Sequence, residues 1–294
     1  MSFRMLGWMP PSVASFIYST VFKPPFVRPA VHWVVKKFIP RQMQIDGLTF
    51  ALNRDDAIVS GALALGFYES YPRRAFAKLL RPEMCVVDIG ANIGLYTAIA
   101  AKAVGSGGQV LAIEPENNNC RFIAETVKLN NLNNVRVLQM AVSDETGQGH
   151  LFLCDSNKAD HRIFNESGDR PSVGVELVRL DDLLGRLGVG RVDVMKMDVQ
   201  GAEAMAFAGM RKTLESNPHV RMMMEFWPWG IKRAKGDPAK LLADIRQAGF
   251  EIFELTDNAC VRLDSSQDAA LAAMPLFRQH ANLLLQRDRT TPVL

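Results

Sequence analysis

The sequence predicts an α/β fold in which a doubly wound sheet of seven core strands follows an N-terminal helical arm. Two apolar runs support this prediction, residues 85–89 and 110–114, because each carries an acid at or near its end and a helix-like segment follows. The same alternation of apolar strand and helix continues as far as residue 286. Strands that alternate with helices are typical of βαβ units in a parallel sheet.

The arm, residues 1–45, differs in composition from the rest of the chain. It is rich in aromatic residues and proline, and it contains six basic residues and no acid. Two short helices are expected in it, at residues 13–22 and 30–38. The arm is either a peripheral anchor on an anionic membrane or a helical cap that packs on the main domain. Both interpretations stay open.

The remaining residues divide into a lead-in and a main domain. Residues 46–80 are expected to form a short hairpin and a helical segment, and residues 81–294 the main domain. The seven core strands are expected at residues 85–89, 110–114, 135–141, 192–197, 220–226, 251–255 and 282–286. The helices between them are expected at residues 95–104, 118–129, 202–214 and 238–248. Two further strands, at residues 150–153 and 175–179, flank a polar loop.

Composition limits the class of protein. With 294 residues and 48% hydrophobic content, the chain can bury one substantial core. Outside the arm there are 28 basic and 31 acidic residues, so a nucleic-acid partner is not expected. The four cysteines are far apart and form no CxxC pair, which favours a reduced, cytoplasmic protein without structural zinc. No run is apolar enough to span a bilayer, and no cleaved signal peptide is predicted.

The turn after the first strand indicates the cofactor. Gly90 and Gly94 are separated by three residues, and Asp88 stands two positions before the first glycine. A nicotinamide-binding turn has the spacing G-x-G-x-x-G, which this turn lacks. S-adenosylmethionine has no pyrophosphate, and its ammonium and sulfonium groups suit an acid in the turn. The turn therefore favours S-adenosylmethionine over a nicotinamide, and Glu114 stands where the ribose hydroxyls are expected.

Three segments together resemble the FkbM family of S-adenosylmethionine-dependent methyltransferases. They are Asp88-Ile-Gly-Ala-Asn-Ile-Gly-Leu-Tyr-Thr97, Ala112-Ile-Glu-Pro115 and Lys196-Met-Asp-Val-Gln-Gly-Ala-Glu203. The resemblance covers roughly residues 46–287, and the arm lies outside it. It implies a class I methyltransferase (Rossmann-like) fold and methyl transfer to hydroxyl groups of sugars, glycans or secondary metabolites.

The resemblance also assigns cofactor contacts residue by residue. The turn after the first strand would line the methionine end of the cofactor. Glu114 would bind the ribose hydroxyls, and Glu69 would close over the amino-acid moiety. The adenine would lie near Ser143 and Asp144. The turn residues that this implies are Asp88, Gly90, Asn92 and Gly94.

One position departs from the pattern typical of the family. After the fourth strand the family has Asp-x-Glu-Gly-x-Glu, and this chain has Gln200 at the first glutamate. Glutamine keeps the shape and the hydrogen-bonding capacity of glutamate but not its charge. We interpret the change as variation and not as loss of activity.

Asp198 and Glu203 follow the fourth strand, at the end where open α/β sheets bind ligands. Asp198 is expected to contact substrate or cofactor, as a base or as a group that orients the acceptor hydroxyl. The alternatives are a helix N-cap and a metal ligand beside Glu203. Because no His/Cys cluster has ligand spacing, no metal is expected.

The polar loop contains a second candidate for the chemistry. His161 lies between Asp160 and Arg162, which suggests a base with its orienting carboxylate and a substrate clamp. The alternative is a solvated loop of a variable insertion.

The fifth strand ends in Glu225-Phe-Trp227-Pro-Trp229. Glu225 is a candidate for a hydrogen bond to a substrate hydroxyl, and Trp227 and Trp229 for stacking on a sugar. Burial of at least one tryptophan against the sheet is equally compatible with the sequence.

The function predicted from these observations is S-adenosylmethionine-dependent O-methylation of a sugar, a glycan or a related small molecule. A nicotinamide-dependent reductase or epimerase, a non-catalytic module and an RNA methyltransferase are the alternatives. The sequence does not identify the acceptor or the oligomeric state.

Overall fold

The computed structural model describes residues 33–288, apart from residues 34, 67, 155–156, 166–167, 169, 257–258 and 276–279. The helix expected at residues 13–22 lies outside the described residues, and of the one expected at 30–38 only its end is described, where residues 35–38 are helical. None of the helices in the described part combines the length and the apolar character that a membrane crossing requires.

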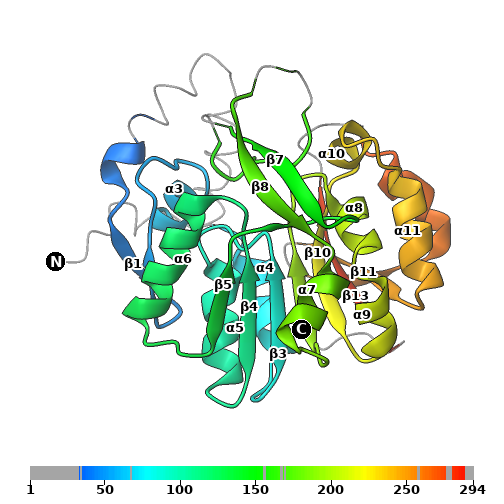
Figure 1. Cartoon of the computed structure of the whole chain (residues 1–294), viewed down its shortest axis with the longest axis horizontal. Coiled ribbons are helices and arrows are strands. Elements are labelled where there is room, and N and C mark those ends of the chain that lie inside the picture. The colour runs from blue at the N-terminus through cyan, green and yellow to red at the C-terminus, as the bar shows by residue number, and fades with distance from the viewer. Residues whose placement is uncertain are drawn as a thin grey trace.

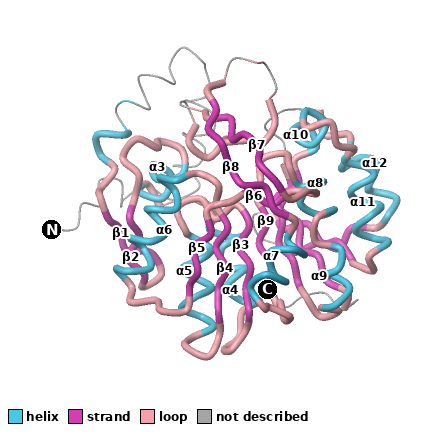
Figure 2. Tube along the Cα trace, in the orientation of Figure 1, coloured by secondary structure: helices cyan, strands magenta, loops and turns pink. Residues whose placement is uncertain are grey.

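A single large sheet organises the molecule (Figures 1 and 2). Five of its strands are parallel, and β13 runs antiparallel between β10 and β11. The order across the sheet is β12 (Cys260–Leu263), β11 (Glu251–Leu255), β13 (Ala281–Gln286), β10 (Arg221–Phe226), β9 (Val194–Met197), β3 (Cys85–Ile89), β4 (Gln109–Ile113) and β5 (Val135–Leu138).

The predicted doubly wound α/β fold is confirmed, with one strand more than expected in the sheet. The additional strand is β12, which pairs only with β11 at the edge of the sheet. Its sequence, Cys-Val-Arg-Leu, has no apolar run, and Val261 is 46% exposed. An edge strand with so little buried surface leaves a weak pattern in the sequence.

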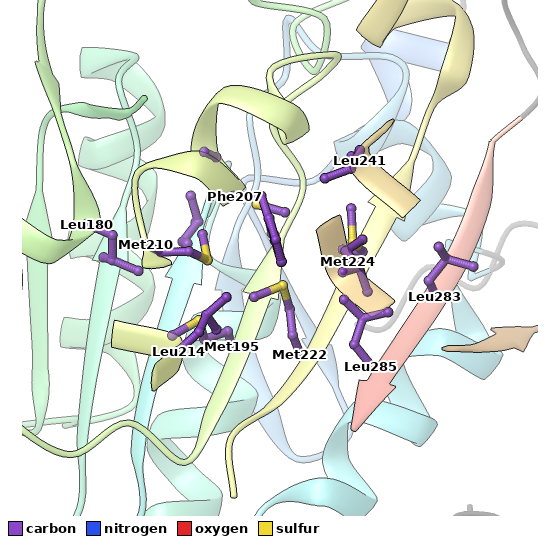
Figure 3. Close-up of a cluster of buried hydrophobic side chains, with 14 of the residues drawn as sticks. Leu180, Met195, Phe207, Met210, Leu214, Met222, Met224, Leu241, Leu283 and Leu285 are labelled. Carbon is purple, nitrogen blue, oxygen red and sulfur yellow. The ribbon is translucent and has the colours of Figure 1, made fainter. Parts of the chain in front are cut away.

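The large sheet has a separate hydrophobic core on each of its two faces. Met222 and Met224 of β10 belong to one cluster, whereas Met223 belongs to the other. The first cluster is large and rich in methionine and leucine, and Figure 3 shows these side chains between the sheet and its covering helices. Because alternate residues of a buried strand point to opposite faces, both faces must be apolar, which explains the continuous apolar run of this strand.

Helices cover both faces. The face that contains Met223 is covered by the hairpin β1 (Gln42–Ile45) and β2 (Leu48–Ala51) and by the helices α3 (Val59–Ala64), α4 (Ser70–Leu79) and α5 (Leu95–Val104). Helix α6 (Asn117–Leu129) packs against β2, β5 and α5. The other face is covered by α7 (Leu180–Leu187), α8 (Glu203–Ala208), α9 (Arg211–Ser216), α10 (Pro228–Arg233), α11 (Pro238–Gln247) and α12 (Asp268–Ala272).

The helix expected at residues 202–214 is divided into α8 and α9. Gly209 stands between them, and a Cβ atom placed on it would lie 2.0 Å from the carbonyl oxygen of Ser143. The close approach of that backbone interrupts the helix. Helices α7, α10 and α12 are short and were not expected from the sequence, because a helix of five to eight residues contains only about one to two turns of periodic pattern.

A small sheet stands beside the large one, at the end where the parallel strands finish. It contains β6 (Ala141–Val142), β8 (Ser172–Val178) and β7 (Gly147–Phe152), in that order. Since β6 begins three residues after β5 ends, β7 and β8 extend from the carboxyl edge of the large sheet, as the upper part of Figure 1 shows. We call this antiparallel pair the ribbon.

Candidate active site

The turn after β3 is held between the ends of two neighbouring strands. The amides of Gly90 and Ala91 both donate to the carbonyl of Ile113, at 2.9 and 3.1 Å. Gly90 has a φ of +77°, and a Cβ atom on it would lie 1.8 Å from the backbone oxygen of Asp198. Only glycine fits here, because the backbone after β9 occupies the place of a side chain. The turn therefore brings the ends of β3, β4 and β9 together.

Asp88 lies beneath this turn and is almost completely buried, with 1% of its surface exposed. Its carboxylate accepts a hydrogen bond of 2.6 Å from the hydroxyl of Thr97 on α5. Burial raises the pKa of Asp88 to about 6, against the opposing effect of that hydrogen bond. The carboxylate is therefore mostly ionised at neutral pH and can attract a cation in the turn.

Glu114 supports the turn from β4. One carboxylate oxygen accepts from the amide of Asn92 at 2.8 Å, and the other accepts from the amide of Glu116 and the side chain of Asn119. A carboxylate offers about four acceptor positions, so one remains for a ligand hydroxyl. Burial raises the pKa of Glu114 to about 7, although its hydrogen bonds act in the opposite direction.

Glu69, Tyr96 and Lys196 form a second connected group. The hydroxyl of Tyr96 donates to Glu69 at 2.7 Å, and the ammonium of Lys196 lies 5.1 Å from the centre of the Tyr96 ring. Burial raises the pKa of Glu69, opposed by Lys196 and by Tyr96. Burial alone would lower the pKa of Lys196, but Asp198, Glu69 and nearby carboxyls outweigh it and raise that pKa. Lys196 is therefore a buried cation among acids.

These groups surround one pocket. It brings together five of the residues expected at the cofactor or the acceptor, Glu69, Asp88, Gly90, Asn92 and Asp198. Gly94 and Glu114 do not belong to its lining, but Glu114 is joined to it through the amide of Asn92. The complete lining is Val59, Tyr68, Glu69, Asp88, Gly90, Ala91, Asn92, Ile93, Leu95, Tyr96, Lys196 and Asp198.

A chain of polar contacts leads from the pocket along the carboxyl edge of the sheet. The side-chain nitrogen of Gln200 donates to Asp198 at 2.7 Å and to Glu225 at 3.0 Å. Asp198 also lies 3.9 Å from the ammonium of Lys196. Burial, followed by the charge of Asp198, raises the pKa of Glu225 well above its ordinary value. The departure from the family pattern at Gln200 thus places an uncharged donor between two carboxyl groups.

The structure places Glu203 in the interior, with 0% of its surface exposed. One of its oxygens accepts from the amide of Gly201 at the start of α8. Its other oxygen is buried and has no hydrogen-bond partner among the described residues. Burial raises its pKa to about 8, so the carboxyl is mostly protonated at neutral pH. Its position supports the start of the helix and offers no surface to an acceptor.

The expected pairing of Asp160 with His161 is not formed. Asp160 instead binds Arg162 at 2.6 Å and Arg170 at 2.9 Å, because two guanidinium groups compete better for a carboxylate than an imidazole does. Nδ1 of His161 accepts from the amide of Cys154, so Nε2 bears the proton in the neutral ring. Burial lowers the pKa of His161. The ring is therefore poorly suited to accept a proton.

The two tryptophans after β10 are enclosed by arginines. The Arg162 guanidinium carbon lies 4.9 Å from the centre of the Trp227 ring, and that of Arg233 lies 4.8 Å from the Trp229 ring. The two rings are 5.3 Å apart. Trp227 is only 6% exposed, so it has no open face for a sugar. This stack connects the loop beyond the ribbon to α10.

Ser143 and Asp144 lie where β6 leaves the sheet edge. Ser143 is 2% exposed, and its amide donates to Val178 at 2.9 Å. Its hydroxyl donates to Asp144, which is exposed. Their position at the carboxyl edge is compatible with the expected place of the adenine, which stays a prediction.

Two residues of this region were not expected as functional, Lys196 and His280. Lys196 had a signal in the sequence, since a lysine stands between two methionines in a buried strand. His280 had none, because it directly precedes a strand far along the chain.

Comparison with known proteins decides the family. The sequence pattern of the methyltransferase FkbM domain matches residues 88–252, more than half of the chain. The chain belongs to the FkbM methyltransferase family. S-adenosylmethionine is the cofactor of this domain, and the acids around a single lysine suit its ammonium, sulfonium and carboxylate groups.

Two relatives with curated names are both 28% identical to this FkbM domain protein. The 2-O-methyltransferase NoeI of Sinorhizobium fredii aligns over 163 residues, 48% of this chain and 63% of NoeI. The methyltransferase sdnD of Sordaria araneosa aligns over 201 residues, 57% of this chain and 73% of sdnD. The chain thus spans less than two thirds of the length of NoeI.

Solved structures of methyltransferases are also similar. An S-adenosylmethionine-dependent O-methyltransferase from Thermotoga maritima has a TM-score of 0.40 at 12% identity, over 77% of this chain and 67% of that chain. Aeropyrum pernix fibrillarin, with natively bound S-adenosylmethionine, has a TM-score of 0.40 at 13% identity, over 70% and 67%.

Proposed function

We propose that this FkbM protein transfers the methyl group of S-adenosylmethionine to a hydroxyl oxygen of a sugar, a glycan or a related small molecule. The observation that supports the proposal most strongly is the connected set of polar groups from the pocket to the carboxyl end of β10. Asp198 lines the cofactor pocket and is joined to Glu225 through Gln200. Carboxylates at such an edge can accept hydrogen bonds from the hydroxyl groups of an acceptor.

On the cofactor side, charged groups of S-adenosylmethionine are paired with side chains of opposite charge. Asp88 and Glu69 face the ammonium, Glu114 accepts from a ribose hydroxyl, and Lys196 faces the carboxylate. S-adenosylmethionine supplies an electrophilic methyl carbon. The protein then has to orient the acceptor oxygen in line with the carbon–sulfur bond and to remove the hydroxyl proton.

The acceptor side rests on Asp198. Its side chain is 24% exposed and borders the pocket, so it can accept the hydrogen bond of a hydroxyl next to the cofactor. His161 and Arg162 have no part in this proposal, because Nδ1 of His161 accepts from the Cys154 amide and Nε of Arg162 donates to Asp160. The name of the relative NoeI, a 2-O-methyltransferase, supports oxygen as the acceptor atom.

The test begins with calorimetric titration of the purified protein with S-adenosylhomocysteine and, in parallel, with NADH. Binding of the first alone is expected, and binding of NADH alone would overturn the proposal. Transfer of tritiated methyl groups from S-adenosylmethionine to a panel of methyl hexopyranosides then tests the acceptor class. RNA is offered as an acceptor in the same assay. If S-adenosylhomocysteine binds but only the RNA is labelled, the proposed acceptor class is wrong.

A further inference from the structure

His280 stands at the carboxyl end of β10, although it is far from that strand in sequence. It directly precedes β13, in which Ala281 pairs with Phe226 and Asn282 pairs with Glu225. This register places the imidazole beside the end of β10. Nε2 of His280 lies 3.5 Å from one oxygen of Glu225. The His280 side chain is 47% exposed, whereas that of Glu225 is 11% exposed, so the pair joins the interior to the solvent.

Glu225 is fixed from its other side. Its second oxygen accepts from Gln200, whose nitrogen also binds Asp198 at the pocket. Gln200 holds this position with a φ of +52°, in the left-handed region that residues other than glycine rarely adopt. A backbone conformation of this kind costs free energy, which the two hydrogen bonds help to offset. The carboxyl group of Glu225 is thereby held with one oxygen toward Gln200 and the other toward His280.

The charge of His280 also acts on one residue of the cofactor pocket. Burial raises the pKa of Glu69, a residue of the pocket lining, and His280 is among the groups that oppose that rise. The charged groups that face the imidazole are therefore Glu225 from β10 and Glu69 from the start of α4. Asp198 and Lys196 of the β9 end stand behind them.

We propose that His280 is the base that removes the acceptor proton, and that Glu225 and Gln200 position it. The inference rests on the proposed function. In the step, the acceptor oxygen forms a bond to the methyl carbon, the carbon–sulfur bond breaks, and its electron pair returns to sulfur. The hydroxyl proton passes to the free imidazole nitrogen of His280 and then to solvent. Imidazole suits this exchange at neutral pH better than an ordinary carboxylate does.

The first arm of the test needs no acceptor. The imidazole Cε1–H signals of the full-length protein are recorded by NMR, with His280 assigned by its absence in His280→Gln. Glu225→Gln and Gln200→Ala are each expected to move the His280 signal and to leave that of His219 in place. His219 is a matched control, because it is exposed just before the opposite end of β10. A His280 signal that neither change moves would overturn the arrangement.

The second arm measures methyl transfer from tritiated S-adenosylmethionine to the methyl hexopyranosides. His280→Gln is expected to lower kcat/KM by about 100-fold or more, with the affinity for S-adenosylhomocysteine unchanged. His219→Gln should behave as the wild type. Full turnover in His280→Gln would refute the base. If no hexopyranoside is labelled, the acceptor class of the proposed function fails, and the NMR arm still decides the arrangement.

Discussion

Individual carboxyl groups in this domain differ in charge because their surroundings differ. Asp88 and Glu114 are buried yet hydrogen-bonded to donors, and their pKa values lie at about 6 and about 7. Glu203 has an oxygen without a partner among the described residues, and its pKa lies at about 8. Near neutral pH the first two can serve as acceptors for a cofactor, whereas the third is mostly a neutral part of the interior.

The raised pKa of Glu203 predicts how stability changes with pH. The unfolded state releases the proton near pH 4.5, whereas the folded state keeps it up to about pH 8. The stability contributed by the protonated form is therefore complete below pH 4.5 and is lost as the pH rises toward 8. Glu203→Gln, which imitates that form, should gain on the order of 2–4 kcal/mol over the wild type between pH 5 and pH 9. Urea unfolding at both pH values measures this gain, and an equal difference at both would contradict it.

Glu114 gives a prediction about the cofactor. Glu114→Ala removes the acceptor of the Asn92 amide and the one free position for a ribose hydroxyl. The Kd for S-adenosylhomocysteine should rise about 10- to 100-fold, since a hydrogen bond to a charged group contributes roughly 1.5–3 kcal/mol. Calorimetry provides the measurement, with Glu125→Gln on the exposed side of α6 as control. Unchanged affinity in a folded variant would remove Glu114 from the cofactor site.

At the scale of elements, close backbone contacts decide where the strands end and the helices break. Gly90 lets the turn after β3 touch the backbone after β9, and Gly209 lets the break between α8 and α9 touch Ser143. Each contact joins segments that are distant in the sequence. The active-site edge is therefore held by backbone contacts as well as by side chains.

Gly90→Ala is expected to destabilise the protein by on the order of 3 kcal/mol or more. The added Cβ atom would force the ends of β3 and β9 apart, and the alanine would have to adopt a positive φ. Gly185→Ala is the control, since Gly185 lies inside α7 with no neighbour within 4 Å of an added Cβ atom. That change should stabilise by about 0.5–1 kcal/mol. Thermal unfolding of the two variants tests the pair, and similar melting temperatures would contradict this account of the turn.

At the scale of the whole molecule, charge is distributed unevenly. The basic excess lies in residues 1–45, and the described end of this segment has two different sides. Ile39 is 2% exposed and Val35 packs against the core, whereas Trp33 and Phe38 are 61% and 59% exposed. The ammonium of Lys37 lies 3.3 Å from the centre of the Trp33 ring. Exposed aromatic and basic side chains on one side suit the headgroup region of an anionic bilayer.

We expect the protein to sediment with phosphatidylcholine vesicles that contain phosphatidylglycerol, and not with vesicles of phosphatidylcholine alone. Replacing both Trp33 and Phe38 by alanine should reduce the bound fraction several-fold. Val173→Ala provides the control, because Val173 is 46% exposed on the ribbon. Equal sedimentation of all three proteins would show that these aromatic residues have no such role.

The sequence was sufficient to predict the sheet, its seven long strands and the family, since apolar runs and the acid-first turn are local patterns. It was not sufficient for the arrangement of the polar loop or of His280. Asp160 pairs with Arg170, and His280 lies beside Glu225, because of how segments that are separate in the sequence pack together. The enclosure of Trp227 by Arg162 is of the same kind. Such contacts leave no periodic pattern along the chain.

The position of β13 has a consequence for how the protein is made. This strand follows the other seven strands of the sheet in the sequence, yet it lies between β10 and β11 in space. During synthesis on the ribosome, β10 and β11 each therefore have one unpaired edge until Ala281–Gln286 has been made. A product cut short before that point would lack both the strand and His280. Such a fragment is expected to aggregate or to be degraded. Only a chain that already contains β13 and His280 is therefore expected to fold stably.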